Sequence, residues 1–128
     1  MVFISDLTSE SGKSLMKKIL NMNLKPDGIF AANDTTAVAA MIEIQAEGIR
    51  IPDDIAVVGF NNEPISQVIR PNLTTIDYPA REIGEIAAAS LINKLKDIQS
   101  VNLSRIIMKH RLIERESSLR SAKNIVKQ

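Results

Sequence analysis

The 128-residue chain contains no cysteine and a single histidine, His110. The absence of cysteine excludes disulfides, thiol catalysis and cysteine-ligated zinc sites. One histidine cannot supply a histidine-rich metal site, and we find no nucleophile placed to use it as a general base. The five glycines are isolated from one another, so a glycine-rich phosphate loop is also missing. The sequence therefore gives no indication of an enzyme, a metal site or a bound cofactor.

The sequence also has no excess of positive or negative charge and no long apolar run. Sixteen Lys and Arg residues against fifteen Asp and Glu residues leave a formal net charge of +1. This balance gives no electrostatic footprint for nucleic acid or an anionic membrane surface. The longest apolar run is far short of the roughly 20 residues that a membrane span requires. Residues 1–4 lack the basic start and the cleavage site of a signal peptide.

What the chain does contain is an alternation of short apolar strands with amphipathic helices. Helix-period apolar residues predict helices over 9–23 and 35–47, with Thr8 or Ser9 as the first N-cap and Gly48 as a C-cap. Continuous apolar runs predict strands, since buried parallel strands rarely alternate; the runs lie at residues 2–4, 29–32 and 55–60. This order predicts an α/β fold with a doubly wound parallel sheet covered on both faces.

Short polar residues follow these strands. Ligands of doubly wound sheets bind beyond the carboxyl ends of the strands, and the residues there include Asn33-Asp34 and Asn61-Asn62. Polar side chains at this edge suit a hydroxyl-rich ligand. Asn and Asp also make good turns and helix caps without any ligand. The residue pattern alone leaves both interpretations open.

The second half of the chain is organised differently. We expect a β-branched strand at residues 73–76, a long helix over about 79–97 and an extended segment over 101–113. Residues 114–128 are polar, and we expect them to be helical or frayed. Within them, Glu114-Arg115-Glu116 is interpreted as a solvated strand end.

Five segments of the chain, beginning with DLTSESG at residues 6–12 and ending with LIERESS at residues 112–118, follow one another in an order and with a spacing that resemble those of LacI/GalR-type transcriptional regulators. The segment PDGIFAAND is similar to the "PDAIFAAND" of that family, and an alanine-rich helix follows it in both cases. The matches cover nearly residues 5–118, and the segments that carry them are DLTSESG (6–12), PDGIFAAND (26–34), GIRIPDDIAVVGF (48–60), LTTI (73–76) and LIERESS (112–118).

The resemblance implies an incomplete periplasmic-binding-protein-like fold of type I. Intact members are about two and a half times longer, with a DNA-binding helix-turn-helix and two α/β subdomains that clamp an effector. By this layout residues 1–76 and 109–128 belong to the C-terminal subdomain and 77–108 to the N-terminal one, and the helix-turn-helix is absent. The helices near Thr35 and Pro64 resemble the family's dimerisation surface. Met41 then belongs either to that interface or to the core.

The resemblance also implies effector-binding residues. Asn33 matches a strand-end Asn that hydrogen-bonds effector hydroxyls in many members, and Asn61 falls where the family usually has Asp. Leu7 falls where several members place an aromatic ring that stacks on a sugar or purine, so a purine effector is disfavoured. Tyr78 takes a position that is often a polar effector contact, although packing at the hinge is an equal alternative.

Together these resemblances predict the effector-binding and dimerisation part of a cytoplasmic LacI-type regulator, a repressor. The expected partners are a sugar or sugar derivative and a second copy of the chain, with operator DNA bound only through the absent head. The alternative that the sequence leaves open is a sugar-binding protein of a transport system, which shares the fold.

Overall fold

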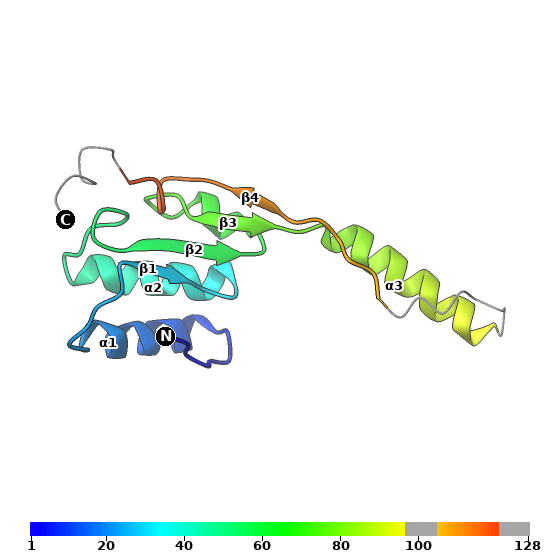
Figure 1. Ribbon diagram of the computed structural model, residues 1–128, viewed down its shortest axis with the longest axis horizontal. Helices are drawn as coiled ribbons and strands as arrows, with labels where there is room; N and C mark the ends of the chain where they lie inside the picture. The colour runs from blue at the N-terminus through cyan, green and yellow to red at the C-terminus, as the bar shows by residue number, and fades with distance from the viewer. Residues whose placement is uncertain (97–104, 121–128) are drawn as a thin grey trace. The chain divides into compact units, whose positions relative to one another are not determined.

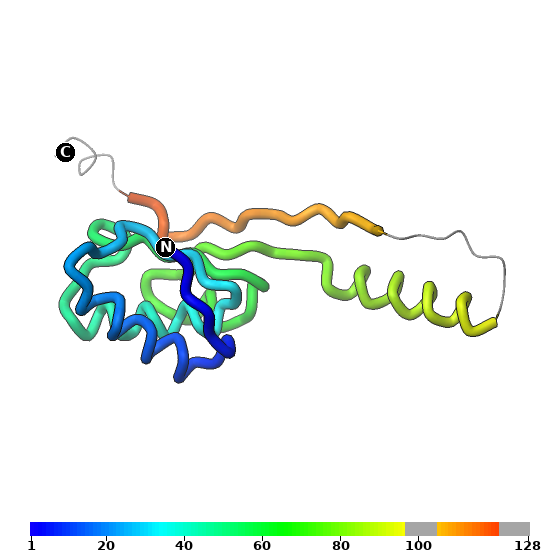
Figure 2. The backbone as a smooth tube through the Cα atoms, turned by 60° about the horizontal axis from the view of Figure 1, so that its bottom comes forward, coloured from blue at the N-terminus to red at the C-terminus, as the bar shows by residue number. Residues whose placement is uncertain are grey.

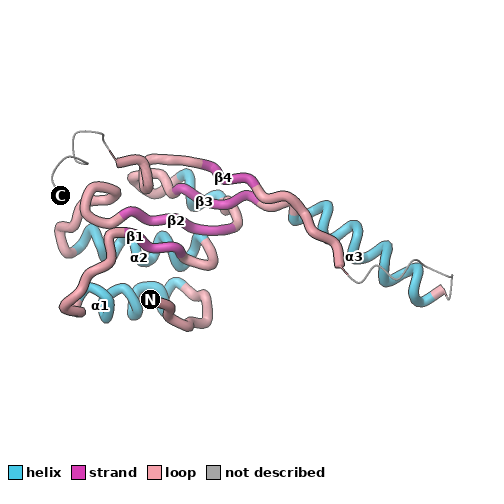
Figure 3. Tube along the Cα trace, in the orientation of Figure 1, coloured by secondary structure: helices cyan, strands magenta, loops and turns pink. Residues whose placement is uncertain are grey.

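The computed structural model describes residues 1–96 and 105–120. Within them the chain forms helices and strands in the order that Figures 1 and 3 show. The elements are α1 (Ser9–Leu20), β1 (Gly28–Phe30), α2 (Asp34–Ala46), β2 (Ala56–Phe60), the short 3-10 helix η1 (Pro64–Gln67), β3 (Thr74–Asp77), α3 (Ala80–Leu95) and β4 (Arg111–Ile113).

The strands form one sheet in the order β1-β2-β3-β4. β1 pairs with β2 in parallel and β2 pairs with β3 in parallel, with Ile29 opposite Val57 and Gly59 opposite Thr75. Parallel neighbours require a crossover connection, which α2 supplies between β1 and β2. The predicted α/β class with a parallel sheet is therefore confirmed.

Helices α1 and α2 form the covering layer, with α2 behind β1 and β2 in Figure 1 and α1 packed beside α2. The hydroxyl of Thr8 caps α1 by accepting from the backbone N–H of Ser11, as predicted. The two helices approach closely at Gly12, where a Cβ would lie 2.7 Å from the carbonyl oxygen of Thr36. A side chain at residue 12 would push them apart. The core lies between this layer and the sheet and contains Met16, Ile19, Val38, Met41, Ile44, Val57 and Leu73.

The predicted strand at residues 2–4 is absent, and this stretch is loop in Figure 3. A strand forms only where its backbone groups find a partner. β1 stands at the end of the sheet order, and among the described residues it pairs with β2 alone. Val2 and Ile4 are 89% and 95% exposed, so their apolar side chains gain no burial either. An apolar run was thus insufficient evidence for a strand.

The burial of the two faces of β2 also differs from the prediction. Val57 and Gly59 are buried, whereas Ala56, Val58 and Phe60 on the opposite face are half-buried. A doubly wound sheet covered on both faces would bury both sets. In the part of the chain that the structure describes, the sheet is covered more fully on the side of Val57 and Gly59.

The segment after β4 is fixed by buried hydrogen bonds. Ser117 is fully buried; its hydroxyl donates to the carbonyl of Val57 at 2.6 Å and accepts from the N–H of Thr74 at 2.8 Å. The N–H of Val57 also donates to the carbonyl of Ser117. Residues 114–120 are turns and loop, so the prediction of a helical or frayed segment is wrong for them. The rest of that prediction, residues 121–128, lies outside the described residues.

Contacts divide the chain into two compact units, Met1–Asp77 with Leu112–Gln128 and Tyr78–Arg111. The first holds the sheet, α1 and α2. The second holds α3, none of whose residues is buried, and an extended stretch that leads to β4. Of the predicted extended segment 101–113, residues 105–110 are loop, 111–113 are strand, and 101–104 lie outside the described part. Figure 2 traces the path of the backbone through each unit. The assignment of 1–76 with 109–128 and of 77–108 to different subdomains of a larger protein stays a prediction.

Candidate functional site

The candidate site lies at the carboxyl ends of β1 and β2. Because the two strands are parallel, the residues that follow them meet at the same edge of the sheet. After β1 the chain enters α2 through Asn33, and after β2 it enters η1 through Asn61, Asn62 and Glu63. The loop that carries Leu7 precedes α1 and reaches the same edge.

Asn33 joins two of these segments. Its side-chain Oδ1 accepts from the N–H of Thr36 at 2.9 Å and caps α2. Its Nδ2 donates to the carbonyl oxygen of Leu7 at 2.8 Å. Asn33 is therefore a helix cap, and it can bind a ligand at the same time, because a primary amide has a second N–H and a second lone pair. The half-buried side chain has one donor and one acceptor beyond these two bonds.

Glu63 joins the two strand ends. Its carboxylate accepts from the Nδ2 of Asn61 at 3.1 Å and from the hydroxyl of Thr35, in the first turn of α2, at 2.9 Å. Its backbone N–H donates to Oδ2 of Asp34 at 2.7 Å. Hydrogen bonds thus run from Leu7 through Asn33 and the first turn of α2 to Glu63 and Asn61. Three of the predicted site residues are brought together in this way.

Asp34 links the loop after β2 to β3 through the two oxygens of its carboxylate. Its side chain is fully buried, and its Oδ1 accepts from the hydroxyl of Thr75 at 2.6 Å. Burial raises the pKa of the Asp34 carboxyl, against the effect of the hydrogen bonds from Thr75 and from the Glu63 N–H. Gly59 leaves the room that this carboxylate occupies, since a Cβ there would collide with Oδ1.

The backbone at this edge is strained. Leu7, Asn61 and Asn62 have positive φ values of 61°, 109° and 52°. The left-handed region costs a non-glycine residue about 1–2 kcal/mol, least for Asn. Such strain persists where the surrounding structure enforces it, and it collects at binding and catalytic sites. All three non-glycine residues with positive φ among the described residues lie in the loops of the candidate site.

Tyr78 belongs to the second unit. Its ring stacks on that of His110, with centroids 6.3 Å apart and planes 30° from parallel. The predicted effector contact of Tyr78 stays a prediction, as does its alternative of hinge packing.

Arg115 has a role that the sequence analysis missed. Its guanidinium donates to the carbonyl of Leu73 at 2.7 Å, to the hydroxyl of Ser66 at 3.0 Å and to Oδ1 of Asn62 at 2.8 Å. The interpretation of residues 114–116 as a solvated strand end is therefore wrong for Arg115. These partners lie 42 to 53 residues away in the sequence, and no local pattern could indicate them. Through Asn62, Arg115 fixes the loop after β2.

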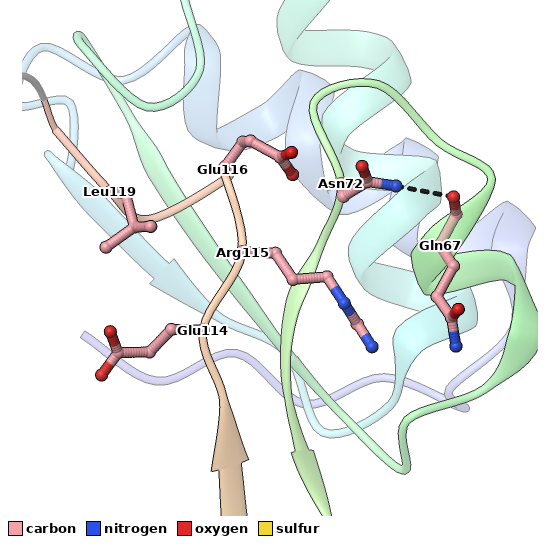
Figure 4. A pocket seen from close by; sticks show the side chains of 6 residues that line it. All are labelled: Gln67, Asn72, Glu114, Arg115, Glu116 and Leu119. Atoms are coloured by element: carbon pink, nitrogen blue, oxygen red, sulfur yellow. Dashed lines mark hydrogen bonds between the residues drawn. The ribbon is translucent and has the colours of Figure 1, made fainter.

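A surface hollow of about 410 Å³ lies elsewhere, around the segment before β3 and the segment after β4 (Figure 4). Its lining contains none of the predicted site residues. Within it the amide of Asn72 donates to the carbonyl of Gln67 at 2.6 Å, and the guanidinium of Arg115 makes the three bonds described above. Its lining residues are Gln67, Asn72, Glu114, Arg115, Glu116 and Leu119.

Among the described residues, no group of three or more His, Asp or Glu side chains is arranged to hold a metal ion. None of the described helices has the length and apolarity needed to cross a membrane.

The chain matches known proteins over most of its length. Residues 2–118 match the model of the periplasmic binding protein-like domain. The HTH-type transcriptional repressor PurR of Aliivibrio salmonicida is 38% identical over 96 residues, which are 75% of this chain and 29% of that protein. The chain therefore spans less than a third of that relative's length.

Solved structures of sugar-bound regulators are among those that this chain resembles. The complex of the transcriptional regulator CelR with cellobiose has a TM-score of 0.83 and 29% identity, and the match covers 89% of this chain and 35% of that one. A LacI family regulator from Arthrobacter sp. FB24 in complex with lactose has a TM-score of 0.77 and 30% identity, over 91% of this chain and 44% of that one. The family match, the repressor relative and these neighbours agree with one another. This chain belongs to the periplasmic binding protein-like family, as the effector-binding region of a LacI-type regulator.

Proposed function

We propose that this chain binds a sugar or sugar derivative at the carboxyl ends of β1 and β2 and thereby controls a transcriptional repressor. The observation that carries the proposal is a network of hydrogen bonds at the sheet edge, set on strained backbone. It joins Leu7 to Asn33 at the start of α2, and it joins Thr35 in the first turn of α2 to Glu63 and Asn61. Amide and carboxylate groups in this position match the paired donors and acceptors of sugar hydroxyls. The sugars bound by CelR and by the Arthrobacter regulator support the same ligand class.

The proposed control is allosteric. An effector shifts a regulator between two arrangements only by the difference in its affinity for them. In this proposal the effector binds one arrangement of the two subdomains more tightly, and the dimer transmits the change to the DNA-binding heads. In this proposal operator binding is carried out by those heads and not by the residues of the sheet edge. The relatives are regulators, which favours this function over a transport-system binding protein.

A homodimer is part of the proposal. The side chain of Met41 is fully buried, so it belongs to the core. Its neighbour Ile42 is 51% exposed, and Ile65 and Val68 around η1 are 39% and 74% exposed. η1 packs against α2, so these apolar side chains are available on adjoining elements. A second copy of the chain would bury them at the surface that the family resemblance indicates.

The site can be tested by replacing Asn33 with Ser. Serine is also a good N-cap residue, so the cap of α2 is kept, while the amide that reaches the effector is lost. We expect affinity for the bound sugar to fall by about 1–3 kcal/mol, the cost of hydrogen bonds left unpaired. Calorimetric titration with cellobiose and lactose measures it.

The matched control is Asn21→Ser, at the C-terminal end of α1. Asn21 is exposed and its amide donates to the carbonyl of Lys17 within its own helix. This variant should bind sugar like the unmodified chain. Equal affinities for the Asn33 and Asn21 variants would contradict the assignment of Asn33, and no binding of any sugar by the unmodified chain would contradict the proposed function.

A further inference from the structure

In the network of hydrogen bonds at the sheet edge, Glu63 is the one residue whose charged group reaches the surface. Its side chain is half-buried, and each carboxylate oxygen accepts one hydrogen bond, from Asn61 or from Thr35. A carboxylate has about four lone-pair sites. Both oxygens can therefore accept further donors from a ligand at the edge of the sheet.

The charge of Glu63 is not neutralised by a neighbouring base. No Lys or Arg of the described residues forms a salt bridge with it. The guanidinium of Arg115 binds Asn62, Ser66 and the Leu73 carbonyl instead. The carboxylate is compensated by neutral donors and by the N-terminal end of α2, which favours a negative charge.

The position of this charge changes the chemistry of Asn61. The amide of Asn61 is itself neutral, but its Nδ2 lies 3.1 Å from a Glu63 oxygen. Part of its donor capacity is thus already used, and a ligand that approaches Asn61 also approaches a negative charge. Hydroxyl and ammonium groups can donate to this pair, whereas a carboxylate or phosphate is repelled.

We propose that Glu63 determines the charge class of the effector, so that the site accepts an uncharged sugar or an amino sugar and rejects sugar acids and sugar phosphates. This inference rests on the proposed sugar-binding function. It assigns a specificity-determining role to a residue that lies outside the set of predicted contacts.

The test compares three probes with the same ring stereochemistry, namely glucose, glucosamine and glucuronate. Binding to the full 128-residue chain is measured by NMR titration at about pH 6, where the amino group of glucosamine is protonated. We expect the chain to bind glucosamine and glucose at least tenfold more tightly than glucuronate, a difference of about 1.4 kcal/mol or more. Because the interaction is electrostatic, the preference should shrink as salt is added.

Glu63→Gln keeps the size and an acceptor oxygen but removes the charge. We expect this variant to lose most of the discrimination between glucosamine and glucuronate. The control is Glu47→Gln, which makes the same charge change at the opposite end of α2, about 20 Å away along a helix of 13 residues. Glu47 is exposed, and its replacement should leave the preference unchanged.

The possible outcomes separate the two proposals. Loss of the preference in the Glu63 variant, with the Glu47 variant unchanged, supports the inference. Binding of glucose with the same ratio among probes in all three proteins overturns the role of Glu63 and leaves sugar binding intact. Failure of glucose, cellobiose and lactose alike to bind the unmodified chain overturns both. Urea unfolding of each variant verifies that the chain is folded.

Discussion

The Gly59→Ala substitution tests the packing beneath the candidate site. Gly59 lies in β2 with Asp34 directly over it, and an added Cβ would collide with Oδ1 of Asp34 and lie 2.9 Å from Cδ2 of Leu73. The backbone of Gly59 is not in the left-handed region, so alanine is acceptable there conformationally. The effect of the substitution is therefore steric.

The expected destabilisation follows from what has to move. Overpacking a dense interior costs about 1–3 kcal/mol. If Asp34 shifts to make room, its bonds from the Thr75 hydroxyl and the Glu63 N–H are weakened, and bonds to a charged group contribute about 1.5–3 kcal/mol each. With partial relaxation we expect a loss of about 3–5 kcal/mol in the free energy of unfolding. This is a large fraction of the roughly 5–15 kcal/mol that stabilises a typical domain.

Urea unfolding followed by circular dichroism measures this loss, and Gly28→Ala is the matched control. Gly28 lies in the neighbouring strand β1, and the nearest atom to its added Cβ is the Ala56 carbonyl oxygen at 3.9 Å, an ordinary contact. That variant should stay within about 0.5 kcal/mol of the unmodified chain, as substitutions without a structural conflict usually do. Combining Gly59→Ala with Asp34→Ala should cost less than the two losses summed, because one partner of the collision is gone. Similar stabilities for the Gly59 and Gly28 variants would refute the reasoning.

Two further predictions concern Arg115 and the exposed apolar surface of α2. Arg115→Lys should lower the free energy of unfolding by about 2–3 kcal/mol, because a single ammonium cannot reproduce the forked donors that reach three separate acceptors. Arg70→Lys is the control, since the guanidinium of Arg70 donates to carbonyls within three residues of itself. A smaller loss for Arg115 than for Arg70 in urea unfolding would count against this role. Ile42→Lys should shift the chain from dimer to monomer in sedimentation equilibrium, because it places a charge in the proposed apolar contact, and a monomeric unmodified chain would contradict the dimer.

The elements that local sequence determines were predicted well. Thr8 and Gly48 mark helix ends through their own chemistry, a hydroxyl that caps α1 and a φ of 70° after α2. The strand at residues 55–60 is apolar enough to be recognised alone, and the structure places β2 at Ala56–Phe60. In these cases the information lies within a few residues of the feature.

Features that depend on distant partners were not predictable in the same way. The apolar stretch at residues 2–4 is not a strand, because strand formation depends on a neighbour that the stretch itself cannot specify. Arg115 was interpreted as part of a solvated strand end and Ser117 as part of a helical or frayed segment, yet both make hydrogen bonds across 40 or more residues of sequence. Glu63 was overlooked because its importance comes from its contacts with Thr35 and Asn61 and from no motif.

The most direct test of the account is a sugar titration of the isotopically labelled chain followed at each backbone amide. With cellobiose or lactose added, we predict that the largest shift changes occur at Leu7, Asn33, Asn61 and Glu63, the residues that the hydrogen bonds bring together at the edge of the sheet. Changes confined to the hollow around Gln67 and Asn72, or no changes with either sugar, would contradict a sugar-binding site at the strand ends.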